Sequence, residues 1–270
     1  MFRASTGSPS RRIASLLLLP LAVAGCVSTA HNAATTSDFL FPAGKDPVVS
    51  GTPVLSVPLS VGIAFVPADS GFAPQSTAGM RAVGLLRRPT VTESQKIEVM
   101  QMISERLRAF PFVRAVTIIP SDFLRPGGGF ENIDQLRATY GVDTIALISY
   151  DQTQFSDEGA LSLVNWTVIG AYVVPAQKNE TETILDTTVF DIGSRRLLFR
   201  ASGTSRVSGR ATLVNQSEEA RLRSEESLRK AAENLVGNLE PEVRAFGKKI
   251  EEPAGQYTIV RLRAGGDHRN

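Results

Sequence analysis

The chain has 270 residues, of which 29 are Lys or Arg and 27 are Asp or Glu. A single Cys excludes an intrachain disulfide framework, and the two His lie near the two ends of the chain, which argues against a His-based hydrolase or a His-ligated metal site. The net charge of +2, without a long run of Lys and Arg, does not indicate a nucleic-acid partner.

The N-terminal region combines basic, apolar and small residues in the order of an export signal. Three arginines precede an apolar segment, residues 13–25, that is shorter than the roughly 20 residues needed to span a bilayer. The segment ends in Val23-Ala24-Gly25-Cys26, a lipobox of small residues that closes on the single cysteine. We expect residues 1–25 to be cleaved and Cys26 to be lipidated; an ordinary secretory signal with a chance cysteine is the alternative.

Lipidation at Cys26 predicts the location of the protein. Two or three acyl chains, at about 0.8 kcal/mol per buried methylene, give lasting membrane attachment. Val27 follows the cysteine, whereas Asp at that position is the inner-membrane retention signal, so we expect the outer membrane with the folded part facing the periplasm. Residues 1–25 hold three of the 29 basic residues and none of the 27 acidic ones, which leaves a net charge of −1 after cleavage.

The composition divides the chain into four parts. These are the signal peptide 1–25, a lipidated flexible tether 26–53, a single α+β domain 54–252 and a C-terminal tail 253–270. The tether begins with residues 27–37, which are rich in Ser, Thr, Ala and Asn. It also holds the apolar string Phe39-Leu40-Phe41-Pro42, which we expect to dock onto the domain rather than to bind a partner.

The first half of the domain alternates strands and helices. A strand is predicted over 54–67, followed by a long connection, 68–91, whose length makes it a functional candidate. Thr92 and Gln95 predict a capping box that starts a helix with an apolar face. A strand over 112–119, a short helix over 132–140 that ends at Gly141, and a continuously apolar strand over 142–150 follow. The apolar face of the first helix consists of Ile97, Met100, Ile103, Leu107 and Phe110.

The second half of the domain is a meander and a helix. Strands over 166–174, 183–191 and 196–207 are separated by short turns, which permit only antiparallel hairpins. A helix over 217–239 should be interrupted by Pro241 and continue as a second piece to Ile250, and a terminal strand is predicted over 257–262. The sum is an α+β fold, a mixed sheet with strand-helix-strand-helix-strand followed by an antiparallel meander and with helices packed on the sheet.

Few residues offer catalytic chemistry. Cys26 is excluded as a nucleophile by its lipid, and Gly127-Gly128-Gly129 lacks the Lys-Ser/Thr of a phosphate loop and is a turn. Asp151, Asp157 and Glu158 follow the strand 142–150 at its carboxyl end, where an acid/base pair or a weak cation site could be built. The alternative is a solvated charged loop, and we favour it. We therefore expect no catalytic residue, no cofactor and no metal.

Arginines are frequent along the last predicted hairpin, at positions Arg195, Arg196, Arg200, Arg206 and Arg210. We expect them to form a basic stripe that faces Glu218, Glu219 and Glu225 of the following helix as ordinary surface pairs. A docking surface for an acidic partner is the alternative.

Several strings of residues stand out when they are taken together. Beside the lipobox they are Phe39-Leu40-Phe41-Pro42, Val61-Gly62-Ile63-Ala64-Phe65-Val66-Pro67, Pro111-Phe112-Val113-Arg114, Leu124-Arg125-Pro126-Gly127-Gly128, Ala146-Leu147-Ile148-Ser149-Tyr150-Asp151-Gln152 and Gly170-Ala171-Tyr172-Val173-Val174-Pro175. In combination, over about residues 26 to 240, they resemble the rhombotarget (rhombotail) lipoprotein family. That family has no established activity.

The family takes its name from members with a C-terminal Gly-Gly signal, a membrane helix and a basic tail recognised by a rhomboid-type protease. This chain has Gly265-Gly266 followed by four polar residues, so the resemblance does not imply intramembrane processing here. The sequence thus predicts an outer-membrane lipoprotein whose domain binds another envelope protein without catalysis. An envelope enzyme or weak cation binder that uses Asp151, Asp157 or Glu158 is the alternative.

Overall fold

The computed structural model describes residues 27–42, 52–67, 91–158, 177–211, 216–252 and 256–262. Cys26 and its lipobox, most of the connection 68–91 and the predicted strand 166–174 lie outside these residues. The described elements are β1 (Val27–Ala34), α1 (Thr36–Leu40), β2 (Val54–Val57), β3 (Leu59–Phe65), α3 (Glu93–Arg108), β4 (Val113–Ile118), a 3-10 turn η3 (Ser121–Phe123), α4 (Gly129–Tyr140), β5 (Thr144–Glu158), β6 (Gln177–Asp191), β7 (Leu197–Ala211), α6 (Gln216–Glu251) and β8 (Thr258–Arg261).

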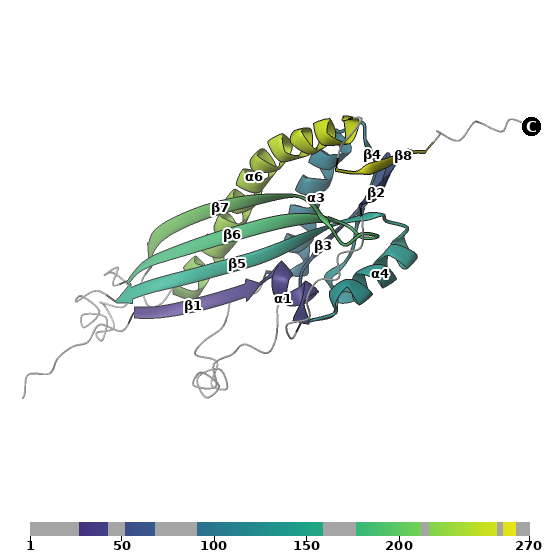
Figure 1. Cartoon of the computed structure of the whole chain (residues 1–270). Coiled ribbons are helices and arrows are strands. Elements are labelled where there is room, and N and C mark those ends of the chain that lie inside the picture. The colour runs from purple at the N-terminus through teal and green to yellow at the C-terminus, as the bar shows by residue number, and fades with distance from the viewer. Residues whose placement is uncertain are drawn as a thin grey trace, which may run out of the picture.

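The fold is α+β with a mixed sheet, as the sequence predicts. The strand order is β4-β3-β5-β6-β7, in which β3 pairs in parallel with β4 and β5 while β5, β6 and β7 form an antiparallel meander. Helices α3 and α6 cover one face of this sheet, and α1 and α4 lie against the other (Figure 1). A second, two-stranded sheet joins β2 in parallel to β8, so the predicted terminal strand is confirmed.

Strand β5 is longer than the predicted strand and has two different neighbours on one edge. Its first part pairs with β3, from Thr144 to Ile148. Its second part pairs antiparallel with β1, from Tyr150 to Asp157. The expectation of a flexible tether is therefore wrong for residues 27–34. Where β3 ends, the backbone N–H and C=O groups on the edge of β5 need partners, and β1 supplies them with its own backbone, whatever its side chains are.

The string Phe39-Leu40-Phe41-Pro42 docks onto the domain as predicted. Phe39 and Leu40 are 2% and 4% exposed and belong to the apolar cluster between the sheet, α1 and α4. The Phe41 ring lies 6.0 Å from the Phe130 ring of α4. The segment after β1 is thus part of the core.

The start of α3 and the end of α4 follow their predicted signals, whereas α4 begins at Gly129 and not at residue 132. The hydroxyl of Thr92 accepts the N–H of Gln95, and the Gln95 side chain accepts the N–H of Thr92, which completes the capping box of α3. Gly141 ends α4 with a φ of 64°, in the left-handed region that suits glycine. Along α3, Met100, Ile103 and Leu107 are buried as expected.

Helix α6 runs through Pro241 without a break, contrary to the predicted interruption. Proline in a helix interior costs about 3 kcal/mol. The three side chains that flank it on the inner face, Leu239 before it and Val243 and Phe246 after it, are at most 1% exposed. Burial of each contributes about 1.5–3 kcal/mol, so together they outweigh the proline penalty. One apolar face continues on both sides of Pro241 and keeps α6 on the sheet.

Candidate functional site

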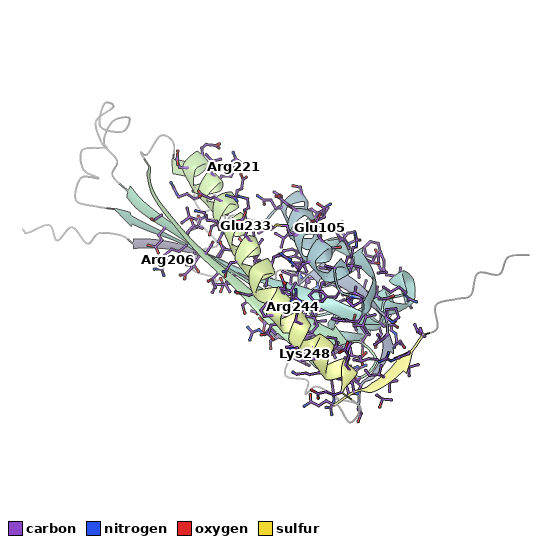
Figure 2. All side chains as sticks on the ribbon, turned by 90° about the horizontal axis from the view of Figure 1, so that it is seen from above. Glu105, Arg206, Arg221, Glu233, Arg244 and Lys248 are labelled. Atoms are coloured by element: carbon purple, nitrogen blue, oxygen red, sulfur yellow. The ribbon has the colours of Figure 1, made fainter. Side chains whose placement is uncertain are left out.

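A groove of about 650 Å³ lies between α3 and the first half of α6. Both helices contribute one face to it, because the lining residues recur every three or four positions in each helix. The α3 wall consists of Thr92, Ser94, Gln95, Glu98, Val99 and Met102, and the α6 wall of Leu222, Glu225, Glu226, Leu228, Arg229 and Ala232. Figure 2 views this seam from above, with Glu105 labelled on α3 and Glu233 on α6.

The groove has an apolar floor. Val99, Leu228 and Ala232 are buried beneath it, at 3%, 4% and 1% exposure, and Met102 is partly buried. Leu222 lies at the rim with 45% of its surface exposed. An accessible, partly apolar hollow between two rigid helices is the kind of place where proteins receive ligands or partner segments.

The groove continues along the helices and is closed at one end. A second hollow of about 310 Å³ shares Met102 with the first and is lined by Glu105, Arg106, Ala109 and Val236. Beyond it an ion pair between Arg106 and Glu240, 3.1 Å long, bridges α3 and α6. The two helices therefore run in the same direction, and we call the end of the groove at Thr92 and Leu222, away from this ion pair, its mouth.

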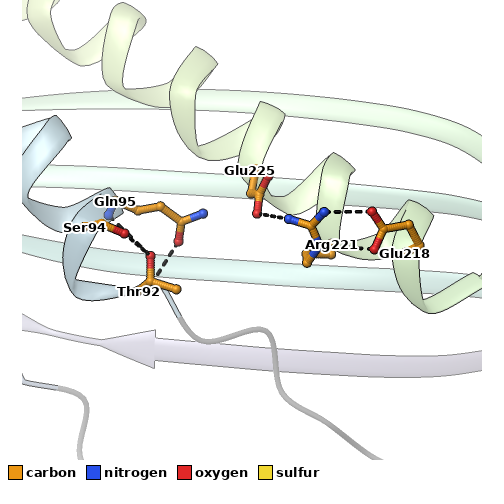
Figure 3. A network of polar contacts seen from close by, with 6 residues as sticks. All are labelled: Thr92, Ser94, Gln95, Glu218, Arg221 and Glu225. Carbon is orange, nitrogen blue, oxygen red and sulfur yellow. Dashed lines mark hydrogen bonds and ion pairs between the residues drawn. The ribbon is translucent and has the colours of Figure 1, made fainter.

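Polar networks hold both sides of the mouth (Figure 3). On α3, Thr92 bonds Ser94 and Gln95 within the capping box. On α6, Arg221 binds the carboxylates of Glu218 and Glu225 at 2.7 and 2.6 Å. The hydrogen bond from Arg221 holds the pKa of Glu218 below its usual range. These contacts lie within single helices and support the first turns of α3 and α6.

Most charged groups along the groove already have a partner on their own helix. Glu226 pairs with Lys230 at 2.8 Å, and Arg229 pairs with Glu233 at 2.6 Å. Glu98 and Glu105, both on α3 and both exposed, form no ion pair within the part of the chain that the structure describes. They are two turns apart on the same helix face.

The first half of α6 is held to the sheet by a buried polar layer. Gln152, Thr183 and Ser227 have no exposed surface. The Gln152 amide donates to the Thr183 hydroxyl at 2.8 Å, and that hydroxyl bonds Ser227 of α6 at 2.8 Å. Tyr150 donates to Gln152 at 3.0 Å, and burial raises the pKa of Tyr150 above its usual value. Fully bonded polar groups of this kind specify one position for the helix, and hence one shape for the groove.

The acidic candidates do not follow a strand but lie within one. Asp151, Asp157 and Glu158 all belong to β5. Asp151 and Asp157 are six residues apart, or about 20 Å along an extended strand, too far to hold one cation between them. Among the described residues, no group of three or more His, Cys, Asp and Glu is arranged to hold a metal ion. The side chains of Asp157 and Glu158 lie outside the described part of the structure.

The arginine stripe faces a different set of acids from the predicted one. Arg200 pairs with Asp186 at 2.7 Å, and Arg206 pairs with Glu180 at 2.8 Å, across the neighbouring strand β6. The predicted partners on α6 pair within their own helix instead: Glu218 and Glu225 bind Arg221, and Glu219 binds Arg223. The expectation is wrong because Arg200 and Arg206 lie on the face of the sheet away from α6, where β6 supplies the acids.

The first arginines of the hairpin lie in its turn. Arg195 pairs with Asp134 of α4 at 3.4 Å and stacks over the Phe130 ring, whose centre lies 5.3 Å from its guanidinium carbon. Arg196 forms no ion pair among the described residues, and the side chain of Arg210 lies outside them. The arginines thus do not form one continuous stripe.

Comparison with known proteins gives a distant structural likeness only. No protein-family model matches the sequence, and no curated protein is similar to it. A variant PelC dodecamer from Paraburkholderia phytofirmans is 13% identical with a TM-score of 0.29, over 71% of this chain and 94% of that one. A second PelC dodecamer structure from the same organism is 10% identical with a TM-score of 0.26, over 80% and 96%. Similarity at this level transfers neither function nor assembly to this chain.

Sequence reasoning did not find the groove. The signal is present in part, because Val99 and Met102 of α3 widen its apolar face toward α6. The sequence does not show that α6 lies beside α3, because the lining residues of α6 lie 120 or more positions after those of α3.

No helix among the described residues is both long and apolar enough to cross a membrane.

Proposed function

We propose that this protein is a lipid-anchored envelope lipoprotein whose domain binds another envelope protein in the α3–α6 groove, without catalysing a reaction. The observation that carries the proposal is the groove itself: an apolar floor, an exposed leucine at the rim and an ion pair that joins the two walls. Interfaces combine an apolar centre with a polar rim in this way. The resemblance to rhombotarget lipoproteins adds no reaction, since that family has no established activity.

The lipid anchor at Cys26 would confine such binding to a membrane surface. Two acyl chains or more hold a protein there stably. Cys26→Ser should leave an unprocessed precursor or a form that no longer fractionates with membranes. Recovery of a mature-size Cys26→Ser protein in the outer-membrane fraction would contradict the anchor.

Sorting to the outer membrane is proposed from Val27. Val27→Asp should move the protein to the inner-membrane fraction in a host that uses Asp at that position as its retention signal. Unchanged recovery in the outer membrane of such a host would remove this support.

Binding through the groove is tested by crosslinking in intact cells. The full chain should give an adduct with a second protein, and Leu222→Asp at the groove rim should reduce its yield. Leu262→Asp is the matched control, because Leu262 is similarly exposed, at 42% against 45%, and does not line the groove. The absence of any heteromeric adduct, or equal yields from both variants, would refute the proposal.

A further inference from the structure

The charges of the groove identify the kind of segment that fits it. This inference rests on the proposed function, since it concerns the partner of the same groove. The two arginines that line the groove are paired, Arg229 with Glu233 and Arg106 with Glu240, which also binds Arg244. Glu98 and Glu105 on the α3 wall are exposed and have no ion pair among the described residues. The uncompensated charge of the groove is therefore negative and lies on α3.

The spacing of these two carboxylates sets a geometry. They are seven residues apart on one helix, a separation of about 10 Å along its axis. Met102 lies between them and lines both hollows. The wall thus alternates acid, apolar side chain, acid. Methionine adapts its shape to an incoming apolar side chain, which suits a contact surface.

We propose that the groove receives a cationic amphipathic helix of the partner protein. In this arrangement, two basic residues seven positions apart pair with Glu98 and Glu105, and apolar residues between them contact Met102 and the floor. A helix fits because the groove is formed by two helices that run in the same direction, and a third helix can pack along their seam. An acidic segment or an anionic lipid surface would instead meet like charge from α3.

The test uses the mature chain, residues 26–270 with Cys26→Ser, which keeps every described element. The probe is a fluorescent, designed amphipathic helical peptide with two Lys seven positions apart. One comparison peptide has Glu in place of both Lys, and another has the same composition in scrambled order. Fluorescence anisotropy should give the Lys peptide an affinity about tenfold higher than the Glu peptide, the effect of two ion pairs at a partly exposed site.

Charge reversal in the protein provides the matched control. Glu98→Lys with Glu105→Lys should weaken binding of the Lys peptide about tenfold and strengthen binding of the Glu peptide. Glu242→Lys with Glu251→Lys changes the net charge equally at exposed positions outside the groove and should leave both affinities unchanged. Gain of Glu-peptide binding also shows that the reversed variant is folded.

Three results would overturn the inference: equal effects of the two double variants, equal binding of the scrambled peptide, or a preference for the Glu peptide. These results are distinct from failure of the proposed function. If the Leu222-dependent adduct forms in cells while the Lys peptide shows no preference, the groove binds a partner of other chemistry. If no such adduct forms in cells, the proposed function itself fails.

Discussion

The close approach of α6 to β7 depends on Gly203. A Cβ atom at this position would lie 2.2 Å from the Ala231 carbonyl oxygen, 2.3 Å from the Leu235 nitrogen and 2.6 Å from the Leu235 Cα. Ordinary van der Waals contact begins at 3.4 Å, so the nearest atom is about 1.2 Å too close. All three atoms belong to the helix backbone, which cannot rotate away as a side chain can.

Gly203→Ala must therefore push α6 off the sheet or distort β7. Overpacking in a core costs typically about 1–3 kcal/mol and occasionally more, and we expect at least the upper part of that range because no side chain can yield. The shift would also loosen Leu235 and Leu239, which have no exposed surface. The α3–α6 groove should lose its shape together with stability.

The control is Gly237→Ala in the same helix. Gly237 is exposed, and a Cβ there would meet nothing within 4 Å. Alanine in a helix interior is favoured over glycine by about 0.5–1 kcal/mol, so this variant should be stabilised. Urea unfolding followed by circular dichroism measures both changes through the midpoint at constant slope. A Gly203→Ala variant within about 0.5 kcal/mol of the parent would refute the packing argument.

Three further changes test other contacts. Burial raises the pKa of the Tyr150 hydroxyl, so as pH rises past about 10 the unfolded chain loses the hydroxyl proton before the folded one does. The free energy of unfolding should therefore fall in that range, and it should fall less steeply in Tyr150→Phe. Urea unfolding at a series of alkaline pH values measures this, and the same pH dependence in both proteins would contradict it. Asn132, 2% exposed, bonds two backbone groups of the turn before α4, and Asn132→Ala should cost about 1–3 kcal/mol in thermal unfolding. Arg200→Ala removes a pair with Asp186 in which the arginine is 61% exposed, and should change stability by no more than about 0.5 kcal/mol.

Local chemistry explains why much of the fold could be predicted. The capping box at Thr92, the left-handed cap at Gly141 and the apolar run of β5 each act over a few residues and are visible in the sequence. Short turns between β6 and β7 leave only an antiparallel pairing. These signals do not depend on what lies across the sheet.

The wrong predictions concern segments whose structure depends on an element far away in the sequence. The residues of β1 show no core pattern, and they form a strand because the edge of β5 needs backbone partners. Pro241 stays within α6 because burial of Phe246 and its neighbours against the sheet stabilises the helix on both sides of the proline. Arg200 and Arg206 of β7 pair with acids of β6 and not with the expected acids of α6, because α6 packs on the opposite face of the sheet.

The candidate site was the least predictable part. The position of Asp151, Asp157 and Glu158 after an apolar run predicts the carboxyl end of a strand, but β5 continues through all three. The groove arises from two helices far apart in sequence, and each wall alone resembles an ordinary helix surface. Only the relative placement of α3 and α6 turns Glu98, Met102 and Leu222 into one surface.

Site-specific photocrosslinking from the α3 wall of the groove tests the central claim most directly. A photoreactive amino acid in place of Met102, in the full-length lipoprotein in its native envelope, should yield a discrete adduct with a second protein. The same residue in place of exposed Lys248, at the far end of α6, should not. No adduct from position 102, or the same adduct from both positions, would contradict binding of a partner in the α3–α6 groove.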